Sequence, residues 1–251
     1  MMQTGHSPRL RQARRMARMT VEMARQWRRL GSLALLDRID FSSGLGDSAN
    51  VLYGLVRAMK PATCVEIGSA RGRSACFIAM ALRENGGGRL HAIDPHQPTA
   101  WNDTGAVDTL AVMQRDLERL RLAPYVEILR ATSGEAAAGW TRPIDLLFID
   151  GDHSYDGVRR DWDLFVPHMA EFGVVVFHDT IWDARPDPRW HRPDMGVPRF
   201  VEELRTAGFP VVTLARDCGV SLVQPVRGGA VLAPRPAQDG VSARQPAPAP
   251  L

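Results

Sequence analysis

The sequence predicts an α/β fold: a mostly parallel seven-stranded sheet with helices on both faces. Apolar runs rich in Val, Ile, Leu and Phe alternate along the chain with segments whose apolar residues recur at helical spacing. Runs without polar alternation are typical of strands buried on both faces, and their alternation with helices implies right-handed βαβ units. The last two strand-like runs flank Asp217-Cys218-Gly219. We therefore expect the sheet to end in an antiparallel hairpin.

The expected elements begin near residue 47. A helix starts at Asp47 or Ser48, either of which can cap it, and runs to about Lys60, where Pro61 stops it. Strands and helices alternate beyond that point. We expect strands at 62–67, 89–94, 125–129, 144–149 and 173–178, helices at 73–84, 106–121, 156–168 and 197–207, and a terminal hairpin of 210–214 and 220–223.

Extensions flank this region, so the expected divisions are 1–46, 47–224 and 225–251. Residues 9–29 carry eight arginines against the single acid Glu22. They predict a basic helix whose apolar positions pack on the body or on a second subunit, or an arm for nucleic acid or a membrane surface. We favour packing, and with it a homo-oligomer, because no aromatic and basic interleaving suited to base stacking follows. The last segment is rich in Pro, Ala and Gly and predicts disorder.

The composition favours one soluble α/β domain with extensions. A length of 251 residues fits such a domain. The three cysteines, Cys64, Cys76 and Cys218, lie far apart and match neither a zinc spacing nor a disulfide framework, which favours a reducing cytosol. No apolar run approaches the length of a membrane span, and the N-terminus is too charged for a secretory signal. A cytoplasmic protein is therefore expected.

Two clusters of acids and histidines directly follow two of the buried strands. The run Phe148-Ile149 leads into Asp150-Gly151-Asp152-His153, and Val176-Phe177 leads into His178-Asp179-Thr180. Ligands of open α/β sheets bind beyond the carboxyl ends of the strands, where these clusters meet. The sequence thus predicts one shared site that binds a metal or moves a proton. In the alternative interpretation, the acids cap turns at the strand ends and His153 is a turn histidine.

Small and acidic residues after the first three strands predict a nucleotide-like ligand. Gly68 opens a loop where backbone can approach a ligand and the next helix offers free N–H groups. Asp94 ends the second strand and can accept from two ribose hydroxyls. Ser133 follows the third strand, where it can meet an adenine edge. Alternatively, Asp94 forms a turn before Pro95, and Ser133 caps a helix with Glu135 in its first turn.

These motifs resemble the class I S-adenosylmethionine-dependent O-methyltransferases, which have a Rossmann-like fold with a terminal antiparallel hairpin. The loop from Val65 to Ala75 is similar to the cofactor loop of the catechol and caffeoyl-CoA type. The run from Asp150 to Asp163, with Phe172-Gly173 and His178-Asp179, is similar to a bacterial branch, methyltransferase family 24. That branch neighbours sugar and macrolide O-methyltransferases and the cephalosporin hydroxylases. The resemblance covers roughly residues 48–224.

The resemblance implies S-adenosyl-L-methionine as cofactor and a small hydroxylated acceptor, such as a sugar or a natural product. It also implies a divalent metal on Asp150, His178 and Asp179, with Mg²⁺ first, although imidazole suits Mn²⁺, Fe²⁺ or Zn²⁺ better. His153 falls where relatives place a catalytic lysine, which makes it the expected base beside Asp150. The expected cofactor residues are Glu66, Gly68, Ser69, Gly72, Ser74, Asp94, Ser133 and Asp150.

Two other functions remain open at this point. The first is a hydroxylase-like relative in which the histidine and acid cluster holds iron. The second is a non-catalytic binding protein that uses the basic arm. The acid and histidine clusters favour an enzyme over a binding protein.

Overall fold

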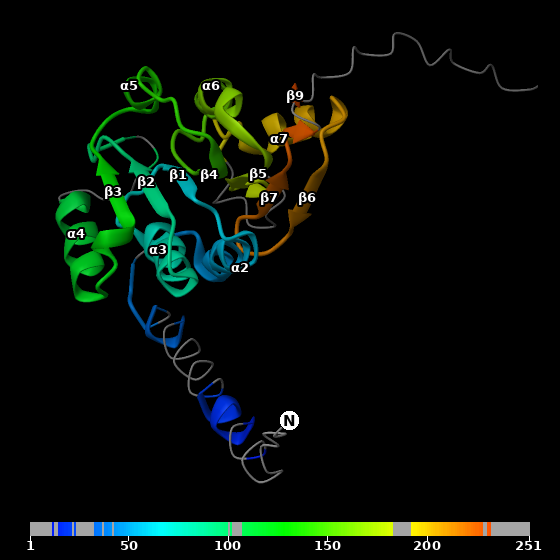
Figure 1. The fold of residues 1–251 in the computed structure, drawn as a ribbon. Helices are drawn as coiled ribbons and strands as arrows, with labels where there is room; N and C mark the ends of the chain where they lie inside the picture. Colours follow the sequence, from blue (N-terminus) through cyan, green and yellow to red (C-terminus); the bar gives the residue numbers. More distant parts are fainter. Residues whose placement is uncertain are drawn as a thin grey trace, which may run out of the picture.

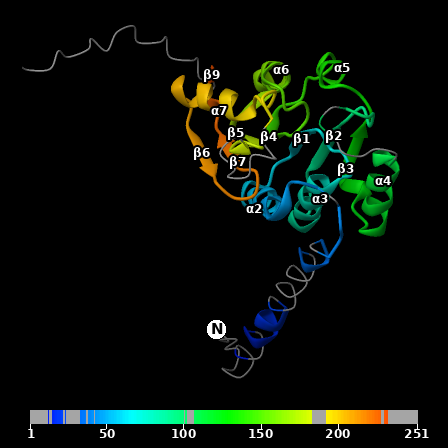
Figure 2. The same cartoon turned by 180° about the vertical axis from the view of Figure 1, so that it is seen from behind.

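The sheet of the computed structural model has seven strands in the order β3-β2-β1-β4-β5-β7-β6, with helices on both faces (Figures 1 and 2). β5 pairs with β7 and β7 with β6 in antiparallel register, whereas the other pairs are parallel. This architecture confirms the predicted fold class. The structure describes residues 12, 15–21, 23, 33–36, 38–41, 43–99, 101, 107–182, 192–227 and 230–231.

The strands and helices lie close to the predicted ranges. The strands are β1 Thr63–Ile67, β2 Arg89–Ile93, β3 Val126–Leu129, β4 Ile144–Ile149, β5 Met169–His178, β6 Val211–Leu214 and β7 Val220–Val223, with a small pair β8 Val226–Arg227 and β9 Ala230–Val231. The helices are α2 Ala49–Met59, α3 Arg73–Asn85, α4 Thr109–Arg119, α5 Ser133–Ala137, α6 Tyr155–Phe165 and α7 Val197–Thr206. Single 3-10 turns are η1 Gly46–Ser48, η2 Ala123–Tyr125 and η3 Val166–His168.

Each central strand contributes side chains to two hydrophobic cores, one on each face of the sheet. Successive side chains of a strand point to opposite faces of the sheet. Cys64 and Leu146 accordingly join the core under α2, α3 and α4, whereas Val65 and Leu147 join the core under α6 and α7. Because both faces are covered, the strands need apolar residues at every position, which explains their unbroken hydrophobic runs.

The first helix of the domain begins differently from the prediction. Ser48 precedes α2, but its side chain makes no capping bond. Instead its backbone N–H and its hydroxyl both donate to the carboxylate of Asp217, at 3.1 and 3.0 Å. The expected cap by Asp47 or Ser48 is therefore wrong, because a contact 169 residues away takes the side chain. This contact ties the start of α2 to the turn before β7.

The helix α5 was expected only in the alternative in which Ser133 caps a helix with Glu135 in its first turn, and a capping box accounts for the helix. Thr132 accepts from the backbone N–H of Glu135, and the Glu135 carboxylate accepts from the Thr132 N–H. Such reciprocal bonds satisfy two of the free donors at a helix start. The cap is Thr132 rather than Ser133, so the Ser133 side chain is left to face the cavity described below.

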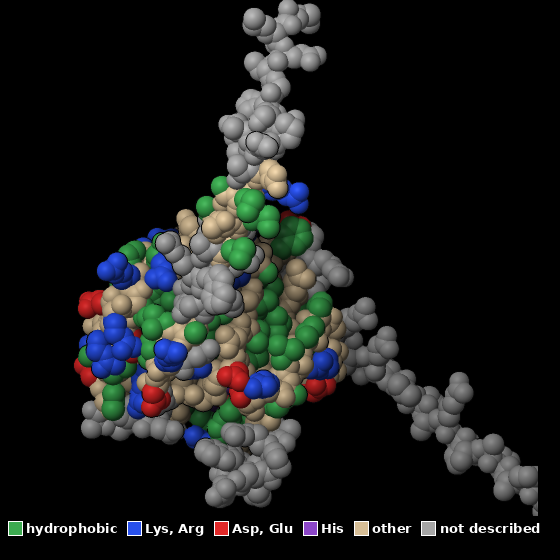
Figure 3. Space-filling view, turned by 90° about the horizontal axis from the view of Figure 1, so that it is seen from below, with side chains coloured by type: hydrophobic (Ala, Val, Ile, Leu, Met, Phe, Trp, Pro, Cys, Tyr) green, Lys and Arg blue, Asp and Glu red, His purple; other side chains and the backbone are tan. Residues whose placement is uncertain are grey.

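The described residues 12, 15–21 and 23 of the N-terminal extension are helical and lie away from the domain (Figure 1), whereas Leu36, Phe41 and Leu45 are buried in the core under α2, α3 and α4. The side chains of Met16, Met19 and Met23 are 63, 55 and 55% exposed, so they do not pack on the body. The apolar positions that the sequence predicts to pack on the body or on a second subunit are these three methionines together with Trp27 and Leu30. Trp27 and Leu30 lie outside the described residues, as does most of 225–251. Seen from below, apolar side chains gather on the domain between charged ones at its edges (Figure 3). None of the helices in the described part is long and apolar enough to cross a membrane.

Candidate active site

A cavity of about 540 Å³ opens at the carboxyl ends of the parallel strands. Its walls come from the loops that follow β1, β2, β3, β4 and β5, as the sequence predicted for a shared site. The predicted residues that line it are Gly68, Ser69, Ser74, Asp94, Ser133, Asp150, His153, His178 and Asp179. Two predicted cofactor residues, Glu66 and Gly72, are not on its wall.

Glycine at two positions lets the loop after β1 approach its neighbours. Gly68 has a φ of +89°, and a Cβ there would lie 2.2 Å from the carbonyl oxygen of Asp150. A side chain would thus separate the loops after β1 and β4. Gly72 has a φ of +84°, and a Cβ there would meet Met113 at 2.6 Å. Gly72 therefore lets α3 begin against α4 rather than contacting the cavity.

Asp94 joins two of the loops that line the cavity. One carboxylate oxygen accepts from the backbone N–H of Ala70 at 2.8 Å, and the other accepts from His96 N–H at 2.6 Å. Asp94 therefore both forms the turn before His96, as in the alternative interpretation, and lines the cavity, as expected of a ligand-binding residue. A carboxylate has about four lone-pair sites, so two remain available for hydroxyl donors in the cavity.

Glu66 lies behind the loop after β1 rather than on the cavity surface. Its side chain is fully buried, and neither carboxylate oxygen has a well-oriented hydrogen-bond partner among the described residues. Burial raises its pKa to about 8, with a contribution from Asp150, while the nearby hydroxyls of Ser74 and Ser69 oppose the shift. We infer that Glu66 stabilises the loop after β1 and does not contact a ligand in the cavity.

Replacing Glu66 by Gln should flatten the dependence of stability on pH. The carboxyl has a pKa of about 8 in the fold and about 4.5 when unfolded, so the unfolded state releases its proton first. Stability from this group is present below pH 4.5 and falls as the pH rises toward 8. Urea unfolding at several pH values should show this fall in the wild type and a smaller one in Glu66→Gln. Equal slopes would contradict the buried protonated state.

Ser133 and Asp161 form the part of the cavity nearest α5 and α6. Asp161 is buried, and this burial raises its pKa to about 6, while the Ser133 hydroxyl opposes the shift. The sequence analysis gave Asp161 no role. The signal that could have found it is an acid on the apolar face of α6, three positions from Val158 and next to Trp162. A buried acid at a cavity is a frequent feature of functional sites.

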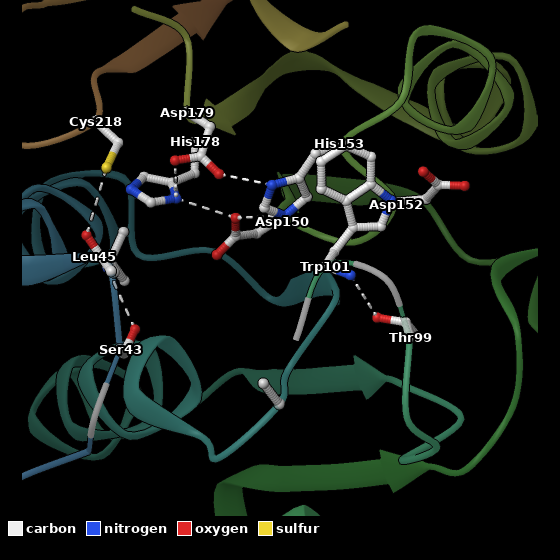
Figure 4. A network of polar contacts seen from close by, with 12 residues as sticks. Ser43, Leu45, Thr99, Trp101, Asp150, Asp152, His153, His178, Asp179 and Cys218 are labelled. Atoms are coloured by element: carbon white, nitrogen blue, oxygen red, sulfur yellow. Dashed lines mark hydrogen bonds and ion pairs between the residues drawn. The ribbon is translucent and has the colours of Figure 1, made fainter. Parts of the chain in front are cut away.

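The acids and histidines after β4 and β5 are cross-paired (Figure 4). The Nδ1 atom of His178 lies 3.1 Å from Asp150 Oδ1, and Nδ1 of His153 lies 2.8 Å from Asp179 Oδ2. The other ring nitrogen of His153 is 3.7 Å from Asp150. The side chains of Asp150 and Asp179 thus pair with histidines, contrary to the alternative in which they cap turns.

These pairs change the charge states of the cluster. Burial opposes protonation of both histidines, but the facing carboxylates outweigh it: the pKa of His153 is raised, and that of His178 rises to about 9. Burial would raise the pKa of Asp179, yet the two histidines hold it below its usual value. Asp179 also has a φ of +58°, a left-handed conformation that is uncommon outside glycine. Backbone strain of this kind often accompanies functional sites.

An aromatic wall, absent from the sequence predictions, covers His153. The ring of Trp101 stacks on the imidazole at 5.2 Å with an interplanar angle of 18°. The guanidinium of Arg192 lies 3.9 Å from the Trp101 centroid and forms an ion pair with Asp194 at 2.7 Å. Residues 183–198, whose four prolines predict a long loop above the sheet and a candidate lid, are described only from Arg192 onward. Arg192 and Met195 line the cavity.

Residues 65–180 match the family model described as a methyltransferase domain, Methyltransf_24. The match runs from β1 through the end of β5, and so contains both the predicted cofactor loop and the acid and histidine clusters. This stretch, slightly less than half of the chain, is similar to a methyltransferase domain. The match supports the predicted resemblance of this region to the class I S-adenosylmethionine-dependent methyltransferases of family 24.

Solved methyltransferases share this fold. A Podospora anserina methyltransferase, PaMTH1, bound to S-adenosylhomocysteine, is 14% identical with a TM-score of 0.59, covering 89% of this chain and 99% of its own. The Streptomyces achromogenes O-methyltransferase TomG, bound to S-adenosylmethionine, is 22% identical with a TM-score of 0.54, covering 72% of this chain and 80% of its own.

A curated relative is an uncharacterised Sinorhizobium fredii protein, 27% identical over 155 residues, which are 57% of this chain and 17% of that protein. The chain thus spans less than a fifth of the length of the curated relatives it matches.

The acid and histidine cluster of this methyltransferase fits Mg²⁺ poorly. Mg²⁺ prefers oxygen donors in near-ideal octahedral geometry. Here Asp150 and Asp179 each pair with an imidazole, and the third expected ligand, His178, is itself an imidazole. Nitrogen donors favour Mn²⁺, Fe²⁺ or Zn²⁺ instead.

Proposed function

We propose that this methyltransferase transfers a methyl group from S-adenosylmethionine to a hydroxyl oxygen of a small acceptor of the sugar or natural-product type. The observation that carries the proposal is the position of His153. Its imidazole lines the same cavity as Asp94 and Ser133, and it is paired to Asp179 at 2.8 Å. A proton acceptor therefore lies beside the predicted binding site of the methyl donor.

The cofactor would occupy the part of the cavity formed by the loops after β1, β2 and β3. The free lone pairs of Asp94 would accept from the ribose hydroxyls, and Ser133 would meet the adenine edge. Gly68, whose missing side chain lets the loops close on each other, would allow backbone to approach the methionine part. With the cofactor held there, the acid and histidine cluster would lie on the acceptor side of the cavity.

In the proposed reaction, His153 acts as the base. As the acceptor oxygen attacks the methyl carbon, an oxygen–carbon bond forms and the sulfur–carbon bond breaks, leaving S-adenosylhomocysteine. The hydroxyl proton moves to the ring nitrogen of His153 that does not contact Asp179. Asp179 orients the imidazole and stabilises the imidazolium, and holding the reactants in line supplies much of the acceleration. A bound divalent metal would lower the pKa of the hydroxyl.

The acceptor would enter against Trp101. Replacing Trp101 by Ala should raise the KM for the acceptor about tenfold or more and leave cofactor affinity unchanged, because a stacked ring contributes contact area on the acceptor side only. Steady-state kinetics with the acceptor varied at saturating S-adenosylmethionine checks this. A matched control is Trp140→Phe, since Trp140 packs against His91 and Phe165 and does not line the cavity. An unchanged KM in Trp101→Ala would contradict this placement of the acceptor.

The function itself is tested by transfer of labelled methyl from S-adenosylmethionine to a panel of hydroxylated sugars and phenolic compounds. Mass spectrometry of the products should show methyl on oxygen. Methylation on nitrogen or carbon would refute the oxygen assignment. Turnover of a panel member without methyl transfer would favour the hydroxylase-like alternative, and an absence of cofactor binding would favour a non-catalytic binding protein.

A further inference from the structure

A third group of potential ligands lies behind His178, on the side away from Asp150. Donor atoms of His178, Asp179 and Cys218 all lie within 4.8 Å of one another. The three residues are 4, 2 and 5% exposed, so the group is buried. Figure 4 shows the Cys218 thiol beside the outer edge of the His178 ring. Cys218 had no predicted role, because it is separated from the other cysteines and from His178 in the sequence.

The sheet register holds Cys218 in this position. His178 at the end of β5 pairs with Val220 at the start of β7. The turn before β7 is fixed by the Ile181 N–H, which donates to the Cys218 carbonyl at 3.0 Å. Gly219, with a φ of +87°, permits the close approach, since a Cβ there would lie 2.8 Å from Ile181 N. The thiol is thus held by backbone contacts rather than by a flexible loop.

Several polar atoms around this thiol are buried without a hydrogen bond. The Nε2 atom of His178 and the hydroxyl of Thr180 have no hydrogen-bond partner among the described residues. The Oδ1 atom of Asp179 also makes no hydrogen bond there, although it lies 3.3 Å from His178 Nδ1 in an ion pair. Buried polar groups are nearly always satisfied, so a cluster of unsatisfied ones indicates a bound ion or ordered water. A thiol, an imidazole and a carboxylate together favour an ion.

The orientation of His178 also fits a metal ligand. Its Nδ1–H can donate to Asp150 at 3.1 Å, and its Nε2 faces Cys218, so an ion that displaces the Nε2 proton would bind on the Cys218 side. A carboxylate that accepts from the second ring nitrogen is the usual support for a metal-ligating histidine. In this arrangement Asp150 supports a ligand and is not a ligand itself.

We propose that His178 Nε2, the Asp179 carboxylate and the Cys218 thiolate bind one zinc-class divalent ion, Zn²⁺ or Fe²⁺, next to the methyl-transfer site. The donor atoms around a tetrahedral zinc ion lie roughly 3.5 Å apart. The three donor atoms here lie within 4.8 Å of one another, so they would move closer together by about an ångström when the ion binds. The ion holds Asp179, which in turn orients His153. Only this last consequence rests on the proposed function; the binding itself does not. The thiolate excludes Mg²⁺.

The test uses the untagged full chain, stripped with a chelator and titrated with Zn²⁺ against a chromophoric competitor. One ion should bind per chain. With Co²⁺ as the probe, a thiolate-to-cobalt charge-transfer absorption should appear in the near ultraviolet. Cys218→Ser should lose this absorption, and His178→Gln should weaken Zn²⁺ binding at least a hundredfold. Cys76→Ala, which removes an equally buried thiol on α3, is the matched control and should keep the absorption.

Failure to bind Zn²⁺ stoichiometrically, or a charge-transfer band that survives in Cys218→Ser, would overturn the proposal. Circular dichroism checks that each variant folds. If Cys218→Ser does not fold, X-ray absorption of the zinc-loaded wild type decides: one sulfur at about 2.3 Å supports the site, and an absence of sulfur overturns it. Calorimetry with S-adenosylhomocysteine on the same samples tests the proposed function separately, because loss of cofactor binding leaves the zinc measurement interpretable.

Discussion

Replacing Asp94 by Ala should weaken the binding of S-adenosylhomocysteine by about a hundredfold or more. In the proposed complex the carboxylate accepts from two ribose hydroxyls, and each hydrogen bond to a charged group contributes about 1.5–3 kcal/mol. The carboxylate also holds Ala70 and His96 through their backbone N–H groups, so the two loops that shape the cavity loosen together. Isothermal titration calorimetry measures the affinity directly.

Two further variants make this prediction specific. Asp94→Asn keeps one oxygen acceptor and should retain part of the affinity, between the wild type and Asp94→Ala. Asp163→Ala removes an exposed acid from the outer side of α6, away from the cavity, and should leave the affinity unchanged. If Asp94→Ala binds S-adenosylhomocysteine with wild-type affinity, the cofactor binds elsewhere. That result would contradict the assignment of the loops after β1 and β2 as the cofactor site.

Replacing His153 by Ala should lower kcat by a factor of about 10² to 10⁴ while sparing cofactor affinity. This range is the usual contribution of a positioned general base. The imidazole lies at the acceptor side of the cavity, paired to Asp179, and makes none of the proposed contacts to the cofactor. Single-turnover methyl transfer and calorimetry together separate the two effects. A variant with near-normal turnover would remove His153 as the base.

The pH dependence of kcat/KM tests the role of His153 as the base independently of the substitution. His153 must be neutral to accept a proton, and although burial disfavours its charge, Asp179 and Asp150 raise its pKa above the ordinary 6.5. The kcat/KM of the wild type should therefore be low in acid and rise with pH through that raised pKa. His168→Ala, on η3 away from the cavity, should show the same profile as the wild type.

The fold could be predicted because its signals are local. The apolar runs 146–149 of β4 and 174–177 of β5 reflect burial on both faces, and the glycines and prolines between elements mark their ends. One error arose from a distant contact, and one incomplete prediction concerned a short local motif. Asp217 takes the Ser48 side chain from its cap, and the capping box that forms α5 is too short to show helical periodicity.

The candidate site was predicted less completely than the fold, because several of its contacts join residues that are far apart in the sequence. Residues that directly follow strands, such as Asp94, Asp150 and His178, could be placed, because the carboxyl ends of parallel strands meet at one edge. Trp101 and Arg192 come from loops with no periodic pattern, and only the structure shows that they stack over His153. Glu66 follows the same strand pattern as the others, yet its side chain points into the core.

The sequence by itself determined the order of strands and helices, the position of the cavity and the residues at the strand ends. These features depend on hydrophobic periodicity and on residues adjacent in the chain. Only the tertiary structure decided which side chains pair across the cluster, which face of His178 remains free and that Cys218 lies beside it. Those relations depend on the antiparallel register of β5 and β7, which joins residues 40 positions apart and leaves no local trace in the sequence.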